Sequence, residues 1–342
     1  MKNSTLFTLL IFAFAKLTFA ELQMPEFATT LTTLLMRQEY KKAFSFTDSI
    51  IAIYPNNLDA HYMRLNTFQT EMLDYESYPT DSSFIKEANI FLNLIAKQNK
   101  NSNKAEKTKM MLFKGNIIGS IALVETKQEK WLDGFKKARL SVNILEKAYK
   151  RDTTFYEACL ATGVYDYYVG KTFKWVPFVG KRESRGISQI ERAASRNSLF
   201  KFAAIHSLLW IFIEKKEYAK ADSLVNILMK KYPKNSILLR VKARNEFLRK
   251  NYDTAFVLGK QLKDISSKRN PVNWSDMFSG YEIMIKILLS KKKFVECQEV
   301  ITEALSYKVP DSAKKIVYVK DNLEYIGVAN INCKNAIKKM QK

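Results

Sequence analysis

The sequence has few of the residues on which metal sites and disulfide frameworks depend. Its 342 residues include only three cysteines and two histidines. Cys159, Cys297 and Cys333 form no zinc-binding spacing with one another or with His61 and His206. An exported disulfide framework usually has a larger, even number of cysteines. We therefore expect no metal and no cofactor, and a buried packing role for Cys297, while a Cys297–Cys333 bridge stays an open alternative.

Motifs for catalysis and for nucleotide binding are also missing. The segments Gly170–Thr172 and Gly180–Lys181 superficially resemble a phosphate loop, but the G-x-x-x-x-G-K-[ST] spacing is absent. No turn that would present a nucleophile accompanies any set of serine, histidine and aspartate residues. His61 and His206 lie in helical patterns, where a histidine more often packs or faces solvent than acts as a catalyst. These absences favour a protein that is not an enzyme.

Long apolar runs are confined to the start of the chain. Lys2 is followed by the apolar run Leu6–Ala15 and then by small residues on either side of Phe19. This pattern predicts a secretory signal peptide over residues 1–20, cleaved after Ala20. An uncleaved anchor is the alternative, but the run is shorter than the roughly 20 residues that span a bilayer. We therefore expect an exported protein, periplasmic or associated with the cell envelope, without a transmembrane segment after cleavage.

Acidic residues are scarce relative to basic ones over most of the chain. Lys and Arg number 56 against 34 Asp and Glu, which gives a net charge of +22. Residues 21–90 are the exception, with five basic and ten acidic residues. Such asymmetry is typical of a charged interaction surface. The alternative is that Lys-rich helix faces only keep the protein soluble.

Helical periodicity is abundant, and it is clearest between Ile205 and Leu262. Two amphipathic helix pairs follow one another there, and their second helices begin at Tyr218 and Tyr252, which are 34 residues apart. The apolar faces of these two helices are Tyr218, Ala221, Val225 and Leu228, and then Tyr252, Ala255, Leu258 and Leu262. A fixed period of 34 residues built from two helices predicts a helical solenoid, in which each repeat packs on its neighbours.

These residues resemble the tetratricopeptide repeat (TPR) family. The positions that match the family's pattern are Leu208, Phe212, Ala221 and Pro233 in one copy and Ala243 and Ala255 in the next. Ile205 stands where the family usually has Trp. The resemblance implies an all-α, right-handed superhelical solenoid that binds a protein or peptide. The Lys and Asn set with which some members grip a peptide's terminal carboxylate is absent.

The same period extends to the rest of the chain and predicts about seven antiparallel helix pairs. Pro55 lies twelve residues after Ala43, as Pro233 does after Ala221, which marks residues 24–55 as a further repeat. The chain divides into a signal peptide (1–20), N-terminal helical repeats (21–160), an aromatic and basic insert with a junction (161–198), C-terminal TPR-like repeats (199–309) and capping helices (310–342).

The segment from Gly163 to Gly186 departs most from this pattern. Six aromatic residues alternate there with Lys and Arg, four glycines interrupt the helical pattern, and Pro177 excludes a regular helix through the middle. One interpretation is a binding site for a polymer, an acidic peptide or a membrane interface. The other is a kinked junction filled by aromatics, with Trp175 mostly buried inside an exposed basic rim. The candidate partner-binding residues are Tyr167, Tyr168, Lys174, Trp175, Phe178, Lys181, Arg182 and Arg185.

A second candidate site is the inner groove of the solenoid. The resemblance implies that the first helix of each pair lines this groove. His206 and Trp210 are four residues apart, as are Arg240 and Arg244, so the members of each pair share a helix face. Two Arg on one face suit a carboxylate or phosphate. The alternative is a pair of solvated side chains without a specific task.

The function predicted from the sequence is a non-enzymatic, exported TPR-like scaffold for protein–protein interaction in the periplasm or at the cell envelope. Its partner is a protein or peptide, acidic in one version of the hypothesis, and no specific nucleic acid is expected. The alternative is an accessory factor that binds an anionic envelope polymer or a membrane surface through basic residues. Ionic strength separates the two, because charge-driven binding weakens steeply with salt.

Overall fold

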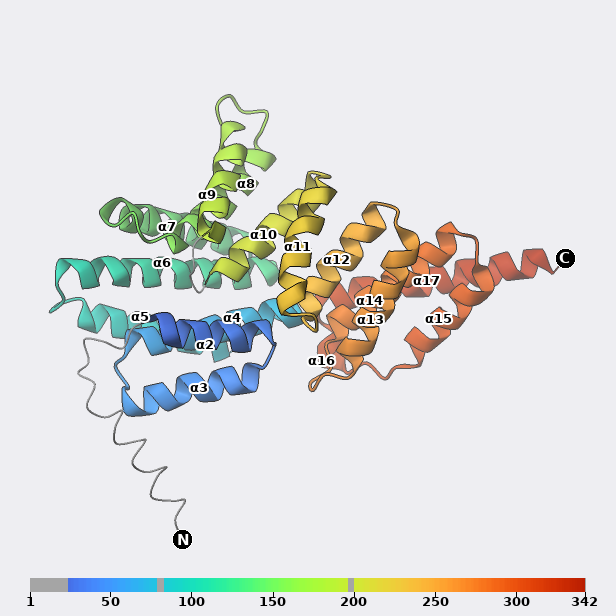
Figure 1. Cartoon of the computed structure of the whole chain (residues 1–342), viewed down its shortest axis with the longest axis horizontal. Coiled ribbons are helices and arrows are strands. Elements are labelled where there is room, and N and C mark those ends of the chain that lie inside the picture. The colour runs from blue at the N-terminus through green and yellow to red at the C-terminus, as the bar shows by residue number, and fades with distance from the viewer. Residues whose placement is uncertain (1–23, 79–82, 196–199, 342) are drawn as a thin grey trace, which may run out of the picture.

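The computed structural model describes residues 24–78, 83–195 and 200–341 (Figure 1). In these ranges the chain consists of helices and the turns between them, without a strand, which confirms the all-α fold class. The predicted signal peptide, residues 1–20, and its cleavage site lie outside the described residues.

The first half of the molecule is built from helices that follow one another along the array. They are α2 Met24–Met36, α3 Tyr40–Ile53, α4 Leu58–Tyr75, α5 Ser83–Gln98, α6 Lys104–Lys127, α7 Trp131–Arg151, α8 Glu157–Thr172 and α9 Lys181–Ser195. The repeat predicted at residues 24–55 is observed as the helix pair α2 and α3, which spans residues 24–53.

The second half continues the array toward the C-terminus. Its helices are α10 Lys201–Glu214, α11 Tyr218–Lys231, α12 Ser236–Leu248, α13 Tyr252–Ser267, α14 Trp274–Ser290, α15 Phe294–Ser306, α16 Asp311–Lys314 and α17 Val317–Met340. The fold is therefore a TPR-like array of helices. The right-handed sense of the superhelix and the number of repeats stay predictions.

One turn geometry precedes five of the helices, and two of its copies are the ones separated by 34 residues. In each case a non-glycine residue with a left-handed φ between 55° and 65° stands two positions before the aromatic residue that begins the next helix. Three residues after the aromatic comes a small, buried residue. The five sets are Gln38 with Tyr40 and Ala43, Glu129 with Trp131 and Gly134, Lys216 with Tyr218 and Ala221, Lys250 with Tyr252 and Ala255, and Lys292 with Phe294 and Cys297. These repeated positions confirm the TPR-like register.

The hairpin of α8 and α9 is closed by glycine. A Cβ atom on Gly186 would lie 2.5 Å from the carbonyl oxygen of Gly163, and one on Gly170 would lie 2.3 Å from the amide nitrogen of Glu183. The two backbones therefore touch at both ends of the hairpin, where only a residue without Cβ fits. The prediction that these glycines interrupt the helices is wrong, and the segment around them is a regular helix hairpin broken only around Pro177.

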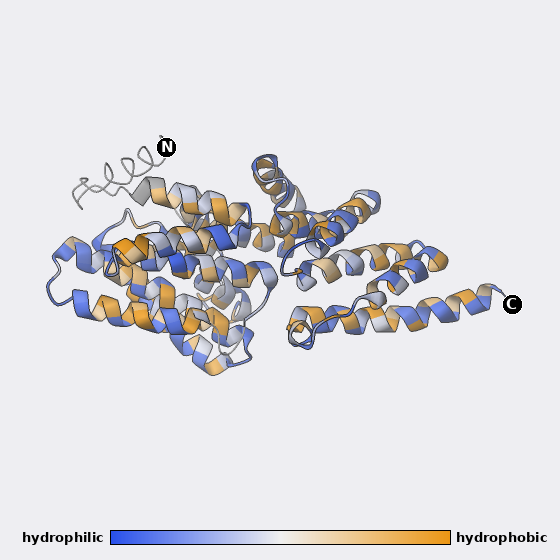
Figure 2. Cartoon of the chain, turned by 90° about the horizontal axis from the view of Figure 1, so that it is seen from below, coloured by the Kyte–Doolittle hydropathy of each residue, from blue (hydrophilic) through white to orange (hydrophobic). Residues whose placement is uncertain are grey.

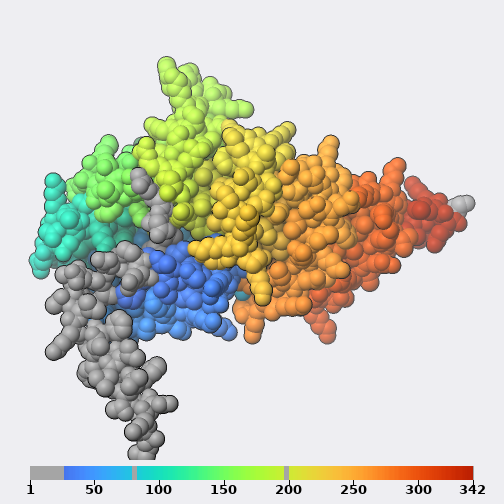
Figure 3. Space-filling view, viewed as in Figure 1, coloured from blue at the N-terminus to red at the C-terminus, as the bar shows by residue number. Residues whose placement is uncertain are grey.

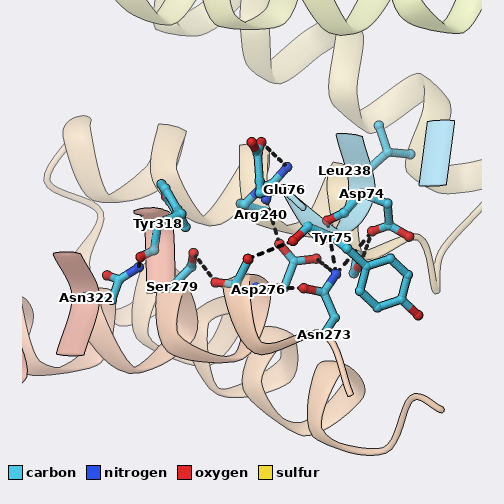
Figure 4. Close-up of polar contacts among 12 residues, drawn as sticks. Asp74, Tyr75, Glu76, Leu238, Arg240, Asn273, Asp276, Ser279, Tyr318 and Asn322 are labelled. Carbon is cyan, nitrogen blue, oxygen red and sulfur yellow. Dashed lines mark hydrogen bonds and ion pairs between the residues drawn. The ribbon is translucent and has the colours of Figure 1, made fainter. Parts of the chain in front are cut away.

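The end of α4 docks on a part of the chain that follows 195 to 200 residues later. Asp74 is fully buried and accepts hydrogen bonds from Asn273 (Figure 4) and from Arg269. The carbonyl of Tyr75 accepts a hydrogen bond from the Ser275 hydroxyl. The expectation that each repeat contacts only its neighbours is therefore wrong here, because α4 packs on α14 as well as on α3 and α5.

The long helix α17 closes the C-terminal end of the array against α14 and α15. Figure 2 shows apolar and polar residues alternating along it, as expected for a helix with one buried face. Cys333 of α17 and Cys297 of α15 are fully buried in one hydrophobic cluster. Both thiols are free, so the predicted packing role of Cys297 is confirmed and the bridge to Cys333 is not formed.

Candidate interaction surfaces

Helix α7 carries an apolar stripe that is buried at one end and uncovered at the other. Trp131, Phe135, Val142 and Leu145 follow one another along one face of the helix. Their exposed fractions fall from 64% at Trp131 and 52% at Phe135 to 7% at Val142 and 0% at Leu145. Leu132, beside Trp131, is also exposed. The first two turns of α7 therefore present large apolar side chains to solvent.

Trp131 is exposed because α8 diverges from the start of α7. Trp131 holds the helix-starting aromatic position that Tyr40 fills in α3, and Tyr40 is buried. The aromatics at the three other equivalent positions pack against hydrophobic clusters. After α7, however, α8 and α9 rise away from it (Figure 1). Phe135 still reaches Tyr165 of α8, with 6.4 Å between ring centroids, whereas no aromatic ring contact of Trp131 is present within the described residues, and its side chain is exposed.

The α8–α9 hairpin is an arm cross-linked by ion pairs. Buried Asp166 of α8 accepts hydrogen bonds from Arg182, at 2.6 and 2.9 Å, and from Arg185 of α9 at 2.6 Å. The hydrogen bond to Asp166 raises the pKa of Arg185. The Tyr167 hydroxyl donates to Glu214 of α10 at 2.9 Å, so Tyr167 is buried and unable to meet a partner. Arg185 is exposed, as predicted for the basic rim, and Arg182 is half-buried, but both side chains are paired with Asp166 within the arm.

The loop at the end of this arm, residues 173–180, projects an apolar tip from the molecule (Figure 3). Trp175 is 78% exposed and Phe178 is 83% exposed. The prediction that Trp175 is mostly buried is therefore wrong, because backbone contacts at glycine close the hairpin and leave no gap for an aromatic wedge. Lys174 and Lys181 are exposed beside the two rings, and Tyr168 is exposed on α8.

Arg240 does not line an open groove. Its guanidinium lies 3.0 Å from the Asp276 carboxylate and 3.4 Å from that of Glu76, and its side chain is almost fully buried (Figure 4). Burial alone would lower the pKa of Arg240, but the two carboxylates outweigh it and raise that pKa. The interpretation of Arg240 as a ligand for an external carboxylate is wrong, because the chain's own α4 and α14 supply the carboxylates.

The other predicted groove residues also have partners within the chain. Trp210 Nε1 donates to His206 Nε2 at 3.0 Å, which fixes His206 as a neutral acceptor at that nitrogen. Arg244 lies 3.8 Å from the Glu282 carboxylate and packs over the ring of Phe247. The structure brings these side chains into helix packing rather than around a common ligand.

A cleft of about 480 Å³ lies between α4 and the segment that leads into α14. Its walls are mostly apolar and include Phe68, Tyr75 and Trp274. Glu71 is the single carboxylate among its described lining residues, and burial raises the pKa of Glu71. One carboxyl group without a second acid or base beside it does not make a catalytic pair.

In the described part of the chain, no three His, Cys, Asp or Glu side chains are placed to hold a metal ion. Within the same residues, no helix has the length and apolarity needed to cross a bilayer.

Sequence reasoning missed the α7 stripe, although a signal for it is present. Trp131 stands two residues after Glu129 and three before Gly134, which is the same turn, aromatic and small-residue series that marks the other repeats. The series identifies Trp131 as a repeat position. Its exposure depends on the direction that α8 takes, and local sequence does not encode that direction.

Comparison with known proteins finds helical arrays of similar fold but does not show which family the chain belongs to. No known family profile and no curated protein matches the sequence. The C-terminal part of a TPR repeat-containing protein from Cytophaga hutchinsonii is 16% identical, with 85% of this chain and 99% of that chain covered and a TM-score of 0.44. The APC/C hetero-tetramer Cut9–Hcn1 gives 14% identity, coverage of 92% and 55%, and a TM-score of 0.48.

The TPR2AB domain of yeast Sti1, in its complex with pHSP90, is 8% identical, with 91% of this chain and 98% of that chain covered and a TM-score of 0.31. At these identities and TM-scores, partners and activities do not transfer from those proteins to this chain.

Proposed function

We propose that the protein is an exported, non-enzymatic scaffold that binds another protein on the uncovered stripe of α7. The observation that carries the proposal is the rise in exposure along one continuous face, from buried Leu145 to exposed Phe135 and Trp131. At the four other helix starts of this kind, the equivalent aromatic is buried or packs against a hydrophobic cluster. A partner helix on α7 would take the place that α8 leaves.

The residue types at the exposed end of the stripe, together with Leu132 beside it, suit such a contact. Trp131, Leu132 and Phe135 lie within the first two turns of one helix. Large aromatic residues dominate binding energy at protein interfaces when they are desolvated by a partner. Lys136 and Arg139 are exposed beside the stripe, and they suit a partner with acidic residues at the rim of the contact.

Export is the second part of the proposal, and it rests on the apolar run Leu6–Ala15. Mass spectrometry of the protein from its native cells, after separation of envelope and cytoplasm, tests it. We expect Glu21 as the first residue and recovery with the envelope or periplasm. A cytoplasmic protein that retains Met1 would remove export from the proposal and leave the docking surface untouched.

Site-specific photo-crosslinking in native cells tests the docking surface. A photoreactive residue at Leu132 should give a protein adduct of defined mass, whereas one at Ile227, another exposed apolar position, on α11, should not. Trp131→Ala with Phe135→Ala should weaken the isolated complex by about tenfold or more, because aromatic anchors carry much of the affinity at such contacts.

The matched control for this variant is Trp175→Ala with Phe178→Ala, which removes the same two residue types from the hairpin tip. That control should keep the adduct at position 132. If position 132 gives no adduct, or if both double variants lose it equally, the stripe is not the docking surface.

Binding to an anionic envelope polymer or membrane through basic residues is the second candidate function. It is favoured by the charge distribution, since the net charge is +22 while residues 21–90 are acidic. Many basic side chains are nevertheless committed to carboxylates within the chain, as Arg182, Arg240 and Arg269 are. A charged surface alone therefore supports this function less directly than the stripe supports protein docking.

A further inference from the structure

The tip of the α8–α9 hairpin is a convex apolar surface. Phe173, Trp175 and Phe178 are exposed within the eight residues 173–180. The amide of Val176 donates to the carbonyl of Phe173 at 2.9 Å, so the loop is folded into a turn rather than extended. The rings therefore point outward from an ordered backbone.

Phe178 is displayed rather than packed. Its backbone φ is 66°, a left-handed conformation that is uncommon for a bulky residue. Packing of its ring within the chain does not stabilise this conformation, because the ring is exposed. The ammonium of Lys181 lies 6.0 Å from the ring centre. Residues with strained backbone conformations cluster at binding sites, where an exposed side chain contacts a ligand or partner.

Along the sequence, the tip and the helix ends that lead into it have charge of one sign, and of these side chains Lys171 is paired with Glu214 of α10 at 2.7 Å. Between Asp166 and Glu183 the chain has four basic residues and no acidic one. Lys174 lies within the tip, and Lys171 and Lys181 lie on the two helix ends that lead into it. Exposed cationic side chains thus lie within the tip, at Lys174, and directly behind it, at Lys181.

We propose that this tip inserts into the interface of an anionic lipid bilayer and attaches the protein to it peripherally. Aromatic rings favour the headgroup region, where the apolar body meets hydrocarbon and the polar edge stays in water. Lysines just behind the rings lie within a Debye length of the negative headgroups and are attracted to them. A lipid surface accommodates a convex tip, whereas a protein partner would need a matching pocket.

The arm is built to keep the tip in place. Backbone contact at Gly163 and Gly186, together with the Asp166 ion pairs, fixes α8 against α9. Lys215, directly after α10, donates a hydrogen bond to Glu183 at 2.8 Å and holds the arm to the array. Because the tip is already ordered, insertion costs little conformational entropy. This attachment goes beyond protein docking on α7, and either activity can be absent without the other.

Vesicle co-sedimentation of the full chain tests the proposal. The wild-type protein should bind vesicles of phosphatidylglycerol mixed with phosphatidylcholine and bind vesicles of phosphatidylcholine alone much less. Trp175→Ala with Phe178→Ala should lower the partition coefficient by about tenfold or more, since the apolar area that enters the membrane is removed. Lys174→Glu should weaken binding at low salt and have less effect at high salt.

Trp131→Ala with Phe135→Ala is the matched control, because it removes the same residue types from α7 and should leave vesicle binding unchanged. Equal binding by wild type and the tip variant would overturn the proposal, as would equal losses in the two double variants. A photoreactive residue at position 175 that yields a protein adduct in cells, with no vesicle binding in vitro, would also overturn it and assign the tip to a protein partner.

Discussion

Arg269 donates a hydrogen bond to each carboxylate oxygen of Asp74, at 3.0 and 2.7 Å, across 195 residues of sequence. Asp74 is fully buried, and only 13% of the Arg269 side chain is exposed. The Arg269 guanidinium also lies over the ring of Tyr75, 4.5 Å from its centre. Burial acts to lower the pKa of Arg269, but the hydrogen bonds to Asp74 raise it overall. This pair links the first half of the molecule to the second.

Arg269→Leu should destabilise the protein by about 3–5 kcal/mol, because it leaves the Asp74 carboxylate buried without its cation. Urea unfolding followed by circular dichroism measures the effect. Adding Asp74→Asn to Arg269→Leu should recover part of the loss, since the uncompensated charge is then gone.

The control for this prediction is Lys293→Ala, which breaks the exposed ion pair with Glu296 and should cost at most about 0.5 kcal/mol. If Arg269→Leu costs no more than this control, the buried pair does not hold the halves together.

The stability should fall on acidification through His206. Burial, followed by the nearby charge of Arg240, lowers the pKa of His206 to about 3. The folded protein therefore keeps His206 neutral, whereas the unfolded chain takes up a proton below its ordinary pKa of about 6.5. Stability from this group is full above that value and is lost as the pH falls toward the folded pKa, by about 1.4 kcal/mol per pH unit at most.

His206→Gln separates this effect from other groups, because Gln can accept the Trp210 hydrogen bond but has no proton to gain. Burial raises the pKa of Asp276, so that residue contributes with the opposite sign in both proteins and cancels in the comparison. We expect the unfolding free energy of wild type to fall more steeply than that of His206→Gln between about pH 6.5 and 5. Parallel pH profiles would contradict the assignment.

Gly186→Ala should destabilise the protein by about 1–3 kcal/mol through overpacking, because the added methyl group would meet the backbone of α8. Gly327→Ala is a matched control on α17, where no atom lies within 4 Å of the added methyl. That change should instead stabilise by roughly 0.5–1 kcal/mol, since alanine is the better helix former. Thermal melts of both variants decide the point, and equal shifts would mean that α8 and α9 do not touch at Gly186.

The three thiols should react slowly with a thiol reagent in the native state and completely in urea. Cys159, Cys297 and Cys333 are buried and free. Burial, and next the neighbouring Cys333, raises the pKa of Cys297, which removes the reactive thiolate at neutral pH. A count of one reactive thiol in urea would show that two of the cysteines are bridged in the isolated protein.

Much of the fold follows from the sequence because it is local. The series that begins at Tyr218 and Tyr252 repeats a turn, an aromatic and a small buried residue, and these features fix helix starts and buried faces without reference to distant residues. The second helices predicted to begin at Tyr218 and Tyr252 are observed as α11 and α13, which begin at those residues. Helix boundaries and register are therefore the best-predicted features.

The candidate sites were predicted less well because they depend on how the repeats stack. Arg240 has the sequence environment of an exposed groove residue, and its burial follows from contacts with Glu76 and Asp276, far from it along the chain. Trp175 has the composition of a packed wedge, and its exposure follows from the direct backbone contact at Gly170. Tertiary contact decides both outcomes.

The docking of α4 on the segment around Arg269 also sets an order of events during synthesis. At about 5–20 residues per second, roughly 10–40 seconds pass between the addition of Asp74 and that of Arg269. Through that interval the carboxylate of Asp74 stays hydrated, and the N-terminal helices lack the surface on which α4 ends. The last third of the chain thus completes the first third. A nascent chain that stops before Arg269 therefore does not fold as a shorter array, because the Asp74 carboxylate lacks the guanidinium with which it pairs in the complete fold.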